Sequence, residues 1–429
     1  MQFLIGMSPL LRGRACRDRR VGGVFTLLVF IPLVWAKLGL AQPVVADLSL
    51  AEVKQRALQV DEGVRAAVDR HQAAAIAAPA AGELPDPVLA VGLQNVPLDN
   101  FSMTRLPTTM AGVTLTQMFP AGDTLAERQR GAEAAARVAD ATAHLTRRAL
   151  VRTVSDEWLS VFAAERALHL LDEQQALLDR WEGSAQTGYS AGRVSASDLV
   201  DLRVRLAKLS DQRQQLLGQA EAARARLARW LGARAQAPWP TTLPTELMQT
   251  PHGAVEDQPS LRVLRDQVQV ARSAVGEARA ALSPEIGVSL GYGINAGTMP
   301  NTASVGISIS LPLFAGDRQL PKLRAAQRQL GAAQLALDEQ AAQLTAQQQA
   351  LQASVQSASA RLDNYDKRIL PALQRIATLA QNQFAAGNGD FAAVIKAQEA
   401  LIDAQQARLD VLVDRARQLI DLNYLLEAA

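Results

Sequence analysis

The sequence predicts a mixed fold, mostly α-helical, with a few β-strands that lie in a membrane. Two uninterrupted helical stretches, at about residues 124–187 and 318–370, are far longer than the roughly 11–12 residues of an average helix. Four short segments alternate between aliphatic residues and small or polar ones, as membrane strands of about ten residues do. These elements follow the same order twice along the 429 residues, which indicates one structural unit used twice.

The first 41 residues read as a secretory signal peptide. An arginine-rich start precedes an apolar run at residues 21–35, and small residues at Gly39 and Ala41 predict cleavage after Ala41. The alternative is an uncleaved anchor, but the run is shorter than the roughly 20 apolar residues of a spanning helix. Cys16, the single cysteine, would leave with the signal, so we expect no disulfide and no thiol catalysis.

The charge of the remaining chain argues against a nucleic-acid partner. Residues 1–41 hold six of the 44 basic side chains and one of the 42 acidic ones, so 38 basic and 41 acidic residues remain. The resulting net charge of −3 differs from the basic stripe that nucleic-acid binding requires.

The internal repeat sets the predicted boundaries. The pair Gly122 and Asp123 returns as Gly316 and Asp317, and the turn "YSAG" at 189–192 returns as "FAAG" at 384–387. We therefore predict a first repeat at 48–231, a proline-rich connector at 232–259 and a second repeat at 260–429. Each repeat runs helix, strand, strand, very long helix, tight turn and return helix. The opening helices are expected at about residues 50–81 and 260–282.

The strands carry the membrane prediction. From Ile286 to Ile294, aliphatic and aromatic residues occupy the even positions, and glycines and one serine the odd positions. The segment "SVGISISL" at 304–311 alternates in the same way, and residues 89–93 and 113–116 do so more weakly. An ordinary half-buried strand of a soluble protein gives the same period. The strand length, the signal peptide, and Phe119 and Phe314 at strand ends favour a membrane.

The long helices are predicted to pack along partner helices. A helix of about 60 residues is about 90 Å long. In the second helix, leucines recur every seven residues, at Leu323, Leu330, Leu337, Leu344 and Leu351. Pro371 should kink this helix, whereas Ala176 holds the matching place in the first repeat, so the two halves should differ there.

Each long helix ends in a predicted turn. Gly192 should reverse the first hairpin, and Ser195 should cap the returning helix together with Asp198. Gly387, together with the neighbouring "NG" residues, should reverse the second hairpin, with Asp390 as the cap.

Four membrane strands cannot close a barrel, and open edges in lipid leave backbone groups unpaired. Several copies must therefore associate. Two copies give eight strands, which side chains fill, while three give twelve, which can leave an opening. The glycine and serine face suits a water-lined lumen, and three chains with two halves each form a quasi-sixfold tube.

The chain resembles the TolC-like outer-membrane efflux proteins of Gram-negative bacteria. The resemblance lies in both strand-to-helix junctions ("QMFPAGD", "LPLFAGD") and both helix turns ("YSAGRVSASDL", "FAAGNGDFAAV"). The stretch "LPDPVLAVGLQNVP" at 84–97 looks more specifically like the heavy-metal branch typified by CzcC and CusC. The resemblance implies a homotrimer with a twelve-stranded barrel in outer-membrane lipid, continued by a periplasmic α-helical coiled-coil barrel. It also implies two partners, a periplasmic adaptor (membrane fusion protein) and an inner-membrane RND transporter.

The same resemblance assigns the hairpin turns. It implies that the adaptor docks on the tip residues Gly192, Arg193, Val194, Ser195, Gly387, Asn388 and Gly389. Charged residues just inside the tip would form the periplasmic gate, here Asp198, Asp201, Asp390 and Lys396. The second repeat departs from an acidic ring, because Ala393 and Lys396 occupy the positions that match Asp198 and Asp201 of the first repeat.

We expect no enzyme, no cofactor and no bound metal. The sequence holds no nucleophile elbow and no phosphate-binding loop, and Ser195 lacks a nearby histidine. The four histidines do not pair at i and i+4 and do not adjoin a cysteine, so they read as ordinary surface or packing residues (His71, His144, His169 and His252).

The sequence therefore predicts a passive exit duct, most specifically for heavy-metal cations. The alternatives are a type I secretion duct, a multidrug efflux duct, or a periplasmic coiled-coil scaffold with soluble β segments. Detergent-dependent extraction from the outer membrane would exclude the scaffold, and the identity of neighbouring genes would separate the ducts.

Overall fold

The computed structural model describes residues 47–192, 194–296 and 299–426. These residues belong to one compact unit. The predicted signal peptide at 1–41 lies outside the described residues, and so does Arg193 of the predicted tip.

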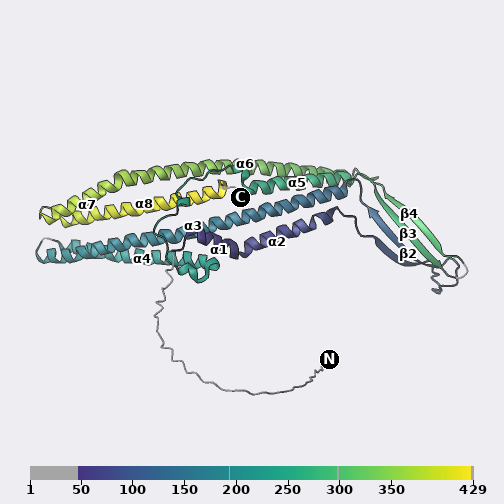
Figure 1. Cartoon of the computed structure of the whole chain (residues 1–429), viewed down its shortest axis with the longest axis horizontal. Helices are drawn as coiled ribbons and strands as arrows, with labels where there is room; N and C mark the ends of the chain where they lie inside the picture. Colours follow the sequence, from purple (N-terminus) through teal and green to yellow (C-terminus); the bar gives the residue numbers. More distant parts are fainter. Residues whose placement is uncertain (1–46, 193, 297–298, 427–429) are drawn as a thin grey trace, which may run out of the picture. The chain divides into compact units, whose positions relative to one another are not determined.

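The four predicted strands are confirmed and form one antiparallel sheet in the order β1-β2-β3-β4 (Figure 1). Their bounds are Val88–Gln94, Met110–Phe119, Glu285–Asn295 and Thr302–Ser310. Leu290 lies opposite Leu115 on one side and Val305 on the other, so the aliphatic positions of neighbouring strands share a face. Within the described chain, the outer edges of β1 and β4 have no strand partner.

The two faces of the sheet differ as the alternation predicts. Leu290 is 59% exposed and Val305 76% exposed, whereas Gly287 and Gly291 on the opposite face are buried. That second face is closely packed, since a Cβ atom added at Gly287 would lie 2.4 Å from the Ser308 hydroxyl. The aliphatic face is therefore left open to its surroundings, while the small-residue face is compact.

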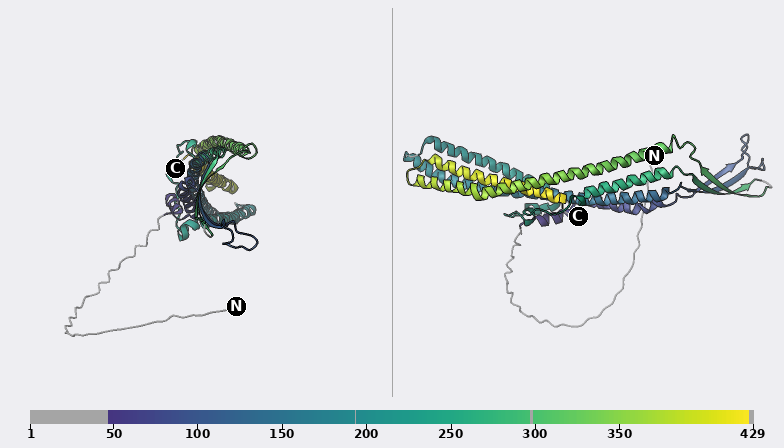
Figure 2. Two further views of the ribbon diagram at one scale, coloured as in Figure 1. Left: turned by 90° about the vertical axis from the view of Figure 1, so that its right-hand side faces the viewer. Right: turned by 90° about the horizontal axis from the view of Figure 1, so that it is seen from above.

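The helices continue from one end of the sheet and form two groups along the molecule, which we call the near tier and the far tier. Next to the sheet, α2 (Glu62–Ala77), α3 (Thr124–Ser190), α5 (Pro259–Ala280) and α6 (Gln319–Asn364) lie side by side in that order. In the far tier the order is α4 (Ala196–Leu231), α3, α8 (Phe391–Leu426) and α7 (Leu370–Ala385). The end view in Figure 2 shows the helices and the sheet following an arc. None of the described helices is long and apolar enough to cross a membrane.

The first predicted helix is wrong in one respect, because residues 50–77 form two helices. α1 (Leu50–Val60) ends at Asp61, whose extended backbone interrupts the helix and whose carboxylate accepts the Val64 N–H at 2.9 Å. The same carboxylate accepts from Trp230 Nε1 at 2.9 Å. Burial would raise the pKa of Asp61, but hydrogen bonds from Trp230, Val64 and Arg229 outweigh it and lower the pKa.

The interruption of the second long helix is confirmed. α6 gives way to a π-helical turn at Tyr365–Ile369, and α7 begins at Leu370 with Pro371 as its second residue. Proline has no N–H to donate to the carbonyl four residues earlier, so the regular ladder cannot continue there. α3 runs unbroken through Ala176, so the two long helices differ as expected.

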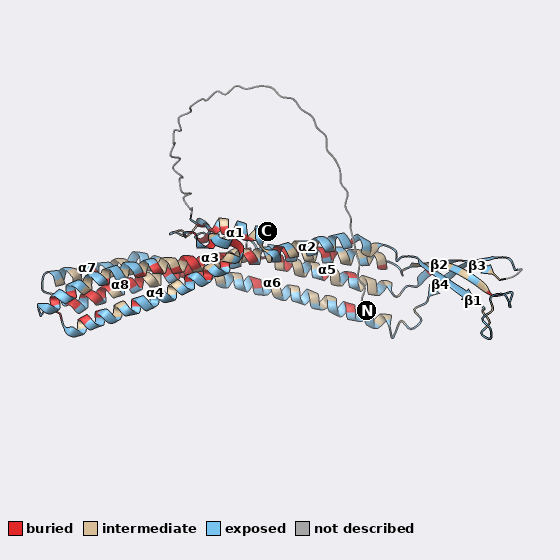
Figure 3. Cartoon of the chain, turned by 90° about the horizontal axis from the view of Figure 1, so that it is seen from below, coloured by how far each residue is buried: buried red, intermediate tan, exposed pale blue. Residues whose placement is uncertain are grey.

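The core lies where α1, α3, α4 and α8 meet the connector. Trp158 is fully buried and stacks on Phe162, with ring centroids 5.7 Å apart. Trp239 of the connector packs against the same tryptophan at 6.1 Å and donates Nε1–H to its carbonyl at 3.3 Å. The heptad leucines Leu337, Leu344 and Leu351 pack against the end of α8, in a cluster that also contains Leu261 of α5. Figure 3 shows buried residues concentrated along these seams, while α6 and α7 are mainly exposed.

A charged cluster crosses the α3–α8 seam. Arg152 of α3 pairs with Asp421 of α8, with Nη2 and Oδ1 2.7 Å apart. Asp156, one turn along α3, has a buried Oδ1 with no hydrogen-bond partner among the described residues. Burial, together with the charge of Asp421, raises the pKa of Asp156 from 3.8 to about 6, although Arg152 and Arg417 oppose the shift.

We predict that Asp156→Asn stabilises the protein at pH 7.5 and not at pH 4. The folded state holds the Asp156 proton more tightly than the unfolded state, so this group's contribution falls as pH rises from about 4 to 6. After allowance for solvent screening, the gain at pH 7.5 is about 1–2 kcal/mol. Denaturant unfolding of the purified protein at both pH values measures it. The exposed Asp338→Asn on α6 is the control, and an equal effect of Asp156→Asn at both pH values would contradict the assignment.

Candidate functional site

The candidate site lies at the ends of the two helical hairpins farthest from the sheet. α3 turns into α4 at residues 191–195, and α7 turns into α8 at 386–390. Gly192 and Gly387 have φ values of +72° and +77°, a region that strains other residues, so both turns depend on glycine. The backbone N–H of Gly192 bonds to Tyr189 O and that of Gly387 to Phe384 O, each at 3.0 Å.

The first turn is held by the predicted capping box. Asp198 N donates to Ser195 Oγ at 3.1 Å, and Asp198 Oδ2 accepts the Ser195 N–H at 3.3 Å. Val194 is buried and packs closely on Gly188, where an added Cβ would lie 2.6 Å from a valine methyl. Val194, one of the predicted tip residues, is therefore a buried packing residue of the turn and is not part of its exposed surface. Asp201 is exposed one turn further along α4.

The second turn is capped by Asp390. Asp390 Oδ1 accepts the Ala392 N–H at 3.3 Å, as expected of the N-cap residue that precedes α8. At Gly389, an added Cβ would lie 2.7 Å from the Phe384 backbone nitrogen, so only glycine allows this approach. Asn388 and Lys396 are both exposed. Both turns thus present short, exposed backbone loops, while two of the predicted gate carboxylates, Asp198 and Asp390, are engaged in capping.

A feature that sequence reasoning missed joins the two hairpins just behind the turns. Trp181 of α3 contacts Phe384 of α7 and Phe391 of α8, with ring centroids 6.0 and 5.8 Å apart. The two phenylalanine rings lie 5.6 Å from each other. Phe391 is only 1% exposed and belongs to a cluster that also contains leucines of α3 and α4. We call Trp181, Phe384 and Phe391 the aromatic cluster.

An ion pair adds to this contact between hairpins. Arg205 of α4 pairs with Glu399 of α8, and both side chains are about one-third exposed. Within the first hairpin, Arg203 Nε lies 3.0 Å from Glu182 Oε1. The aromatic cluster and the Arg205–Glu399 pair therefore hold the hairpins together at the tip. In the sequence, this contact between hairpins is signalled by Phe384 and Phe391, which stand on either side of the second turn.

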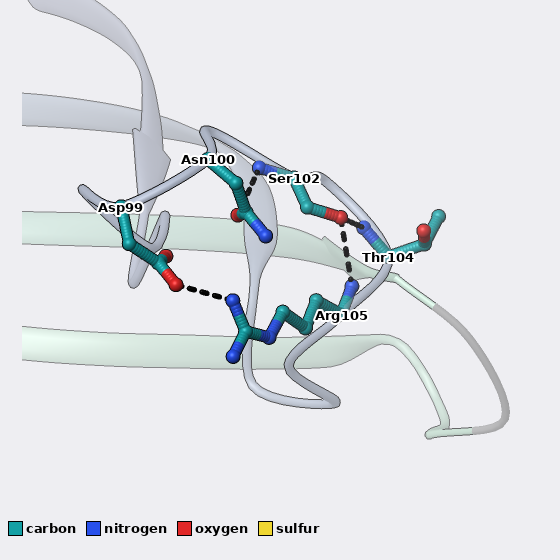
Figure 4. A network of polar contacts seen from close by, with 5 residues as sticks. All are labelled: Asp99, Asn100, Ser102, Thr104 and Arg105. Carbon is teal, nitrogen blue, oxygen red and sulfur yellow. Dashed lines mark hydrogen bonds and ion pairs between the residues drawn. The ribbon is translucent and has the colours of Figure 1, made fainter.

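At the opposite end, the β1–β2 loop has an ordered polar network (Figure 4). Asp99 pairs with Arg105, and Ser102 Oγ accepts the Arg105 N–H at 3.2 Å. The Ser102 N–H donates to Asn100 Oδ1 at 3.1 Å, so the loop is built from consecutive side-chain turns. Phe101 of this loop is 69% exposed and has a positive φ of 51°.

Comparison with known proteins agrees with this architecture. The chain is similar to the outer-membrane channel OprN, at 20% identity over 89% of this chain and 90% of that one, with a TM-score of 0.75. It is also similar to CusC, whose structures concern folding and transmembrane channel formation. The identity to CusC is 16% over 90% of this chain and 93% of that one, with a TM-score of 0.78. It is also similar to the outer membrane protein VceC of Vibrio cholerae, at 17% identity over 89% of this chain and 96% of that one, with a TM-score of 0.76. No curated protein matches by sequence.

Part of the chain also matches a protein family by its sequence. Residues 250–427 match the outer membrane efflux protein family, and this range contains β3, β4 and the second hairpin. Both the family and the similar folds are those of channel proteins and not of enzymes. Residues 250–427 thus match the outer membrane efflux protein family, and the fold of the described chain is that of outer-membrane channel proteins.

Proposed function

We propose that three copies of this chain form a passive exit duct, with a twelve-stranded barrel continued by a helical barrel. The observation that carries this proposal is the open sheet, whose β1 and β4 edges lack partners within the described chain. In lipid, those edges must pair with the edges of other copies. The exposed aliphatic face suits lipid, and the compact glycine and serine face suits an unobstructed lumen.

The helical tiers support the same closure. The outer helices of the far tier, α4 and α7, have exposed apolar side chains, with Val200 57%, Val204 48%, Ile376 52% and Leu379 59% exposed. An arc of helices that ends in apolar faces on both sides can bury them against the next copy. We infer that the two repeats, residues 48–231 and 260–429, act as quasi-equivalent sixths of the ring.

The proposed partners are a periplasmic adaptor and an inner-membrane RND transporter, and the proposed cargo is a heavy-metal cation. The cargo rests on the stretch at 84–97 and on the similarity to CusC, while energy and substrate choice would belong to the transporter. The glycine turns support docking at the tip, because backbone without bulky side chains allows close approach. The exposed Asp201 and Lys396 are the proposed gate charges not engaged in capping.

We expect Gly387→Trp to abolish resistance while leaving assembly intact. Bulk at an exposed turn with a positive φ should block docking without touching the sheet edges. Growth of a deletion strain carrying each variant is measured on metal salts and on drugs, and oligomers are examined in detergent. Gly218→Trp, at an exposed glycine in the body of α4, is the matched control.

Unchanged resistance of the Gly387→Trp strain, with normal expression, would contradict the role of the tip. If the deletion strain is sensitive to drugs and not to metals, the multidrug alternative is favoured. If the deletion strain fails to secrete a protein, the type I secretion duct is favoured.

We also expect Phe391→Ala to raise conductance of the purified protein in planar bilayers. Removal of a buried phenylalanine costs about 3–5 kcal/mol and here weakens the contact that holds the hairpins together. Tyr189→Ala, at a half-exposed aromatic of the first hairpin, is the control and should leave conductance unchanged. Conductance of Phe391→Ala equal to that of the unmodified protein would show that the aromatic cluster does not restrain the gate.

A further inference from the structure

We propose that the segment joining β4 to α6 binds the headgroups of anionic phospholipids through Arg318, Lys322 and Arg324. This segment follows β4 directly, at the end of the sheet from which the helices continue. The inference rests on the proposed function, because the sheet must lie in a membrane for its end to meet headgroups. It adds to that function a preference for one class of lipid.

The beginning of α6 holds positive charge without a carboxylate beside it. The chain between Asp317 and Asp338 has four cationic side chains and no acidic one, namely Arg318, Lys322, Arg324 and Arg328. All four are exposed, and none forms an ion pair with a residue in the described part of the chain. Arg318 is the N-cap of α6, and the first turn lacks an acidic residue, although cations are unfavourable at this end of the helix dipole. An anion from outside the described chain would therefore be stabilised here.

The first repeat has similar cations at the start of its own long helix. Lys322 corresponds to Arg128 of α3 at a spacing of 194 residues. Arg324 corresponds to Arg130 at the same spacing. Arg318 takes the place of an uncharged threonine, so the second repeat keeps two cations and adds a third.

The cations of the first repeat are neutralised within the chain. Arg128 Nε lies 2.7 Å from Glu277 Oε1, and Arg130 pairs with Glu127. In the second repeat, Pro321 takes the position of Glu127. The two junctions therefore share their positive charge and differ in the carboxylates that balance it, which leaves the second junction free to bind an anion.

Exposed apolar side chains come directly before these cations. Leu311 is 60% exposed, Leu313 78% and Phe314 72%, and they continue the aliphatic face of β4. Aromatic residues at strand ends mark the interface between acyl chains and headgroups in membrane barrels. A phospholipid supplies both an apolar region for Leu313 and Phe314 and a phosphate for the cations, whereas inorganic phosphate supplies only the second.

Distance from the membrane surface selects three of the four cations. A helix rises about 1.5 Å per residue, so Lys322 and Arg324 lie about 5 and 8 Å along α6 from Gln319. Arg328 lies about 14 Å along it. Attraction to charged lipid falls off within a Debye length of about 8–10 Å. Arg328 therefore lies beyond the proposed surface and is a matched control on the same helix.

The test places a tryptophan at the contact by Phe314→Trp in the full-length protein, reconstituted in vesicles of phosphatidylcholine and phosphatidylglycerol. Bromine on the acyl chains of one lipid at a time quenches nearby tryptophan fluorescence, and the protein without this substitution gives the background of the other tryptophans. The ratio of quenching by the two lipids measures lipid preference at the junction. We expect phosphatidylglycerol to be preferred at least tenfold at 0.1 M salt, and the preference to vanish at 1 M, where the Debye length is about 3 Å.

Neutralising substitutions are made in the Phe314→Trp protein. Arg318→Gln, Lys322→Gln and Arg324→Gln should each lower the preference, by up to about fivefold. Arg328→Gln should leave it unchanged, and so should Arg375→Gln, at an exposed cation of α7 in the far tier. Millimolar inorganic phosphate should not compete.

An unchanged preference in the triple variant Arg318→Gln/Lys322→Gln/Arg324→Gln would overturn the proposal. Dissociation of its oligomers in detergent would also overturn it, because the cations would then contact a second copy, and competition by phosphate would indicate a free anion instead. Equal quenching of Phe314→Trp by both lipids would refute the lipid preference and leave the membrane position of the sheet intact. Quenching by neither lipid would contradict the proposed duct as well.

Discussion

The outer edges of β1 and β4 carry backbone N–H and C=O groups that have no neighbouring strand in the described chain. In hydrocarbon, each such group costs several kcal/mol, which is more than any single side-chain contact of the sheet can return. In the proposed duct, the sheet is therefore one part of a larger closed barrel. The helical tiers have the same incomplete form, since each ends in an outer helix with apolar side chains exposed. In that proposal, closure of the strands also fixes how many copies form the helical wall.

Local chemistry allowed much of the architecture to be predicted from the sequence. The alternation from Ile286 to Ile294 specifies both the strand and the face it turns outward, because a shift of one residue would reverse every side chain. The turn glycines, the Ser195 capping box and Pro371 each act within a few residues. Such features follow from sequence because the groups that satisfy each other are neighbours in the chain.

Other features depend on residues far apart in sequence, and these were missed. The break between α1 and α2 at Asp61 is held partly by Trp230 and Arg229, which no local pattern links to it. The heptad of α6 indicated a partner helix without identifying α8. The contact of His71 with Asp140 likewise exists only once α2 lies along α3. In the aromatic cluster, Trp181 comes from the other hairpin.

The π-helical turn at Tyr365–Ile369 makes the two hairpins mechanically unequal. α3, at 67 residues, is an unbroken rod of about 100 Å that spans both tiers. Its counterpart is divided by the wide turn and by Pro371, and the bidentate contact of Arg408 with Asp366 braces that junction from α8. Elastic strain applied at the tip concentrates where bending is easiest, so the second hairpin acts as the compliant arm and the first as the stiff one.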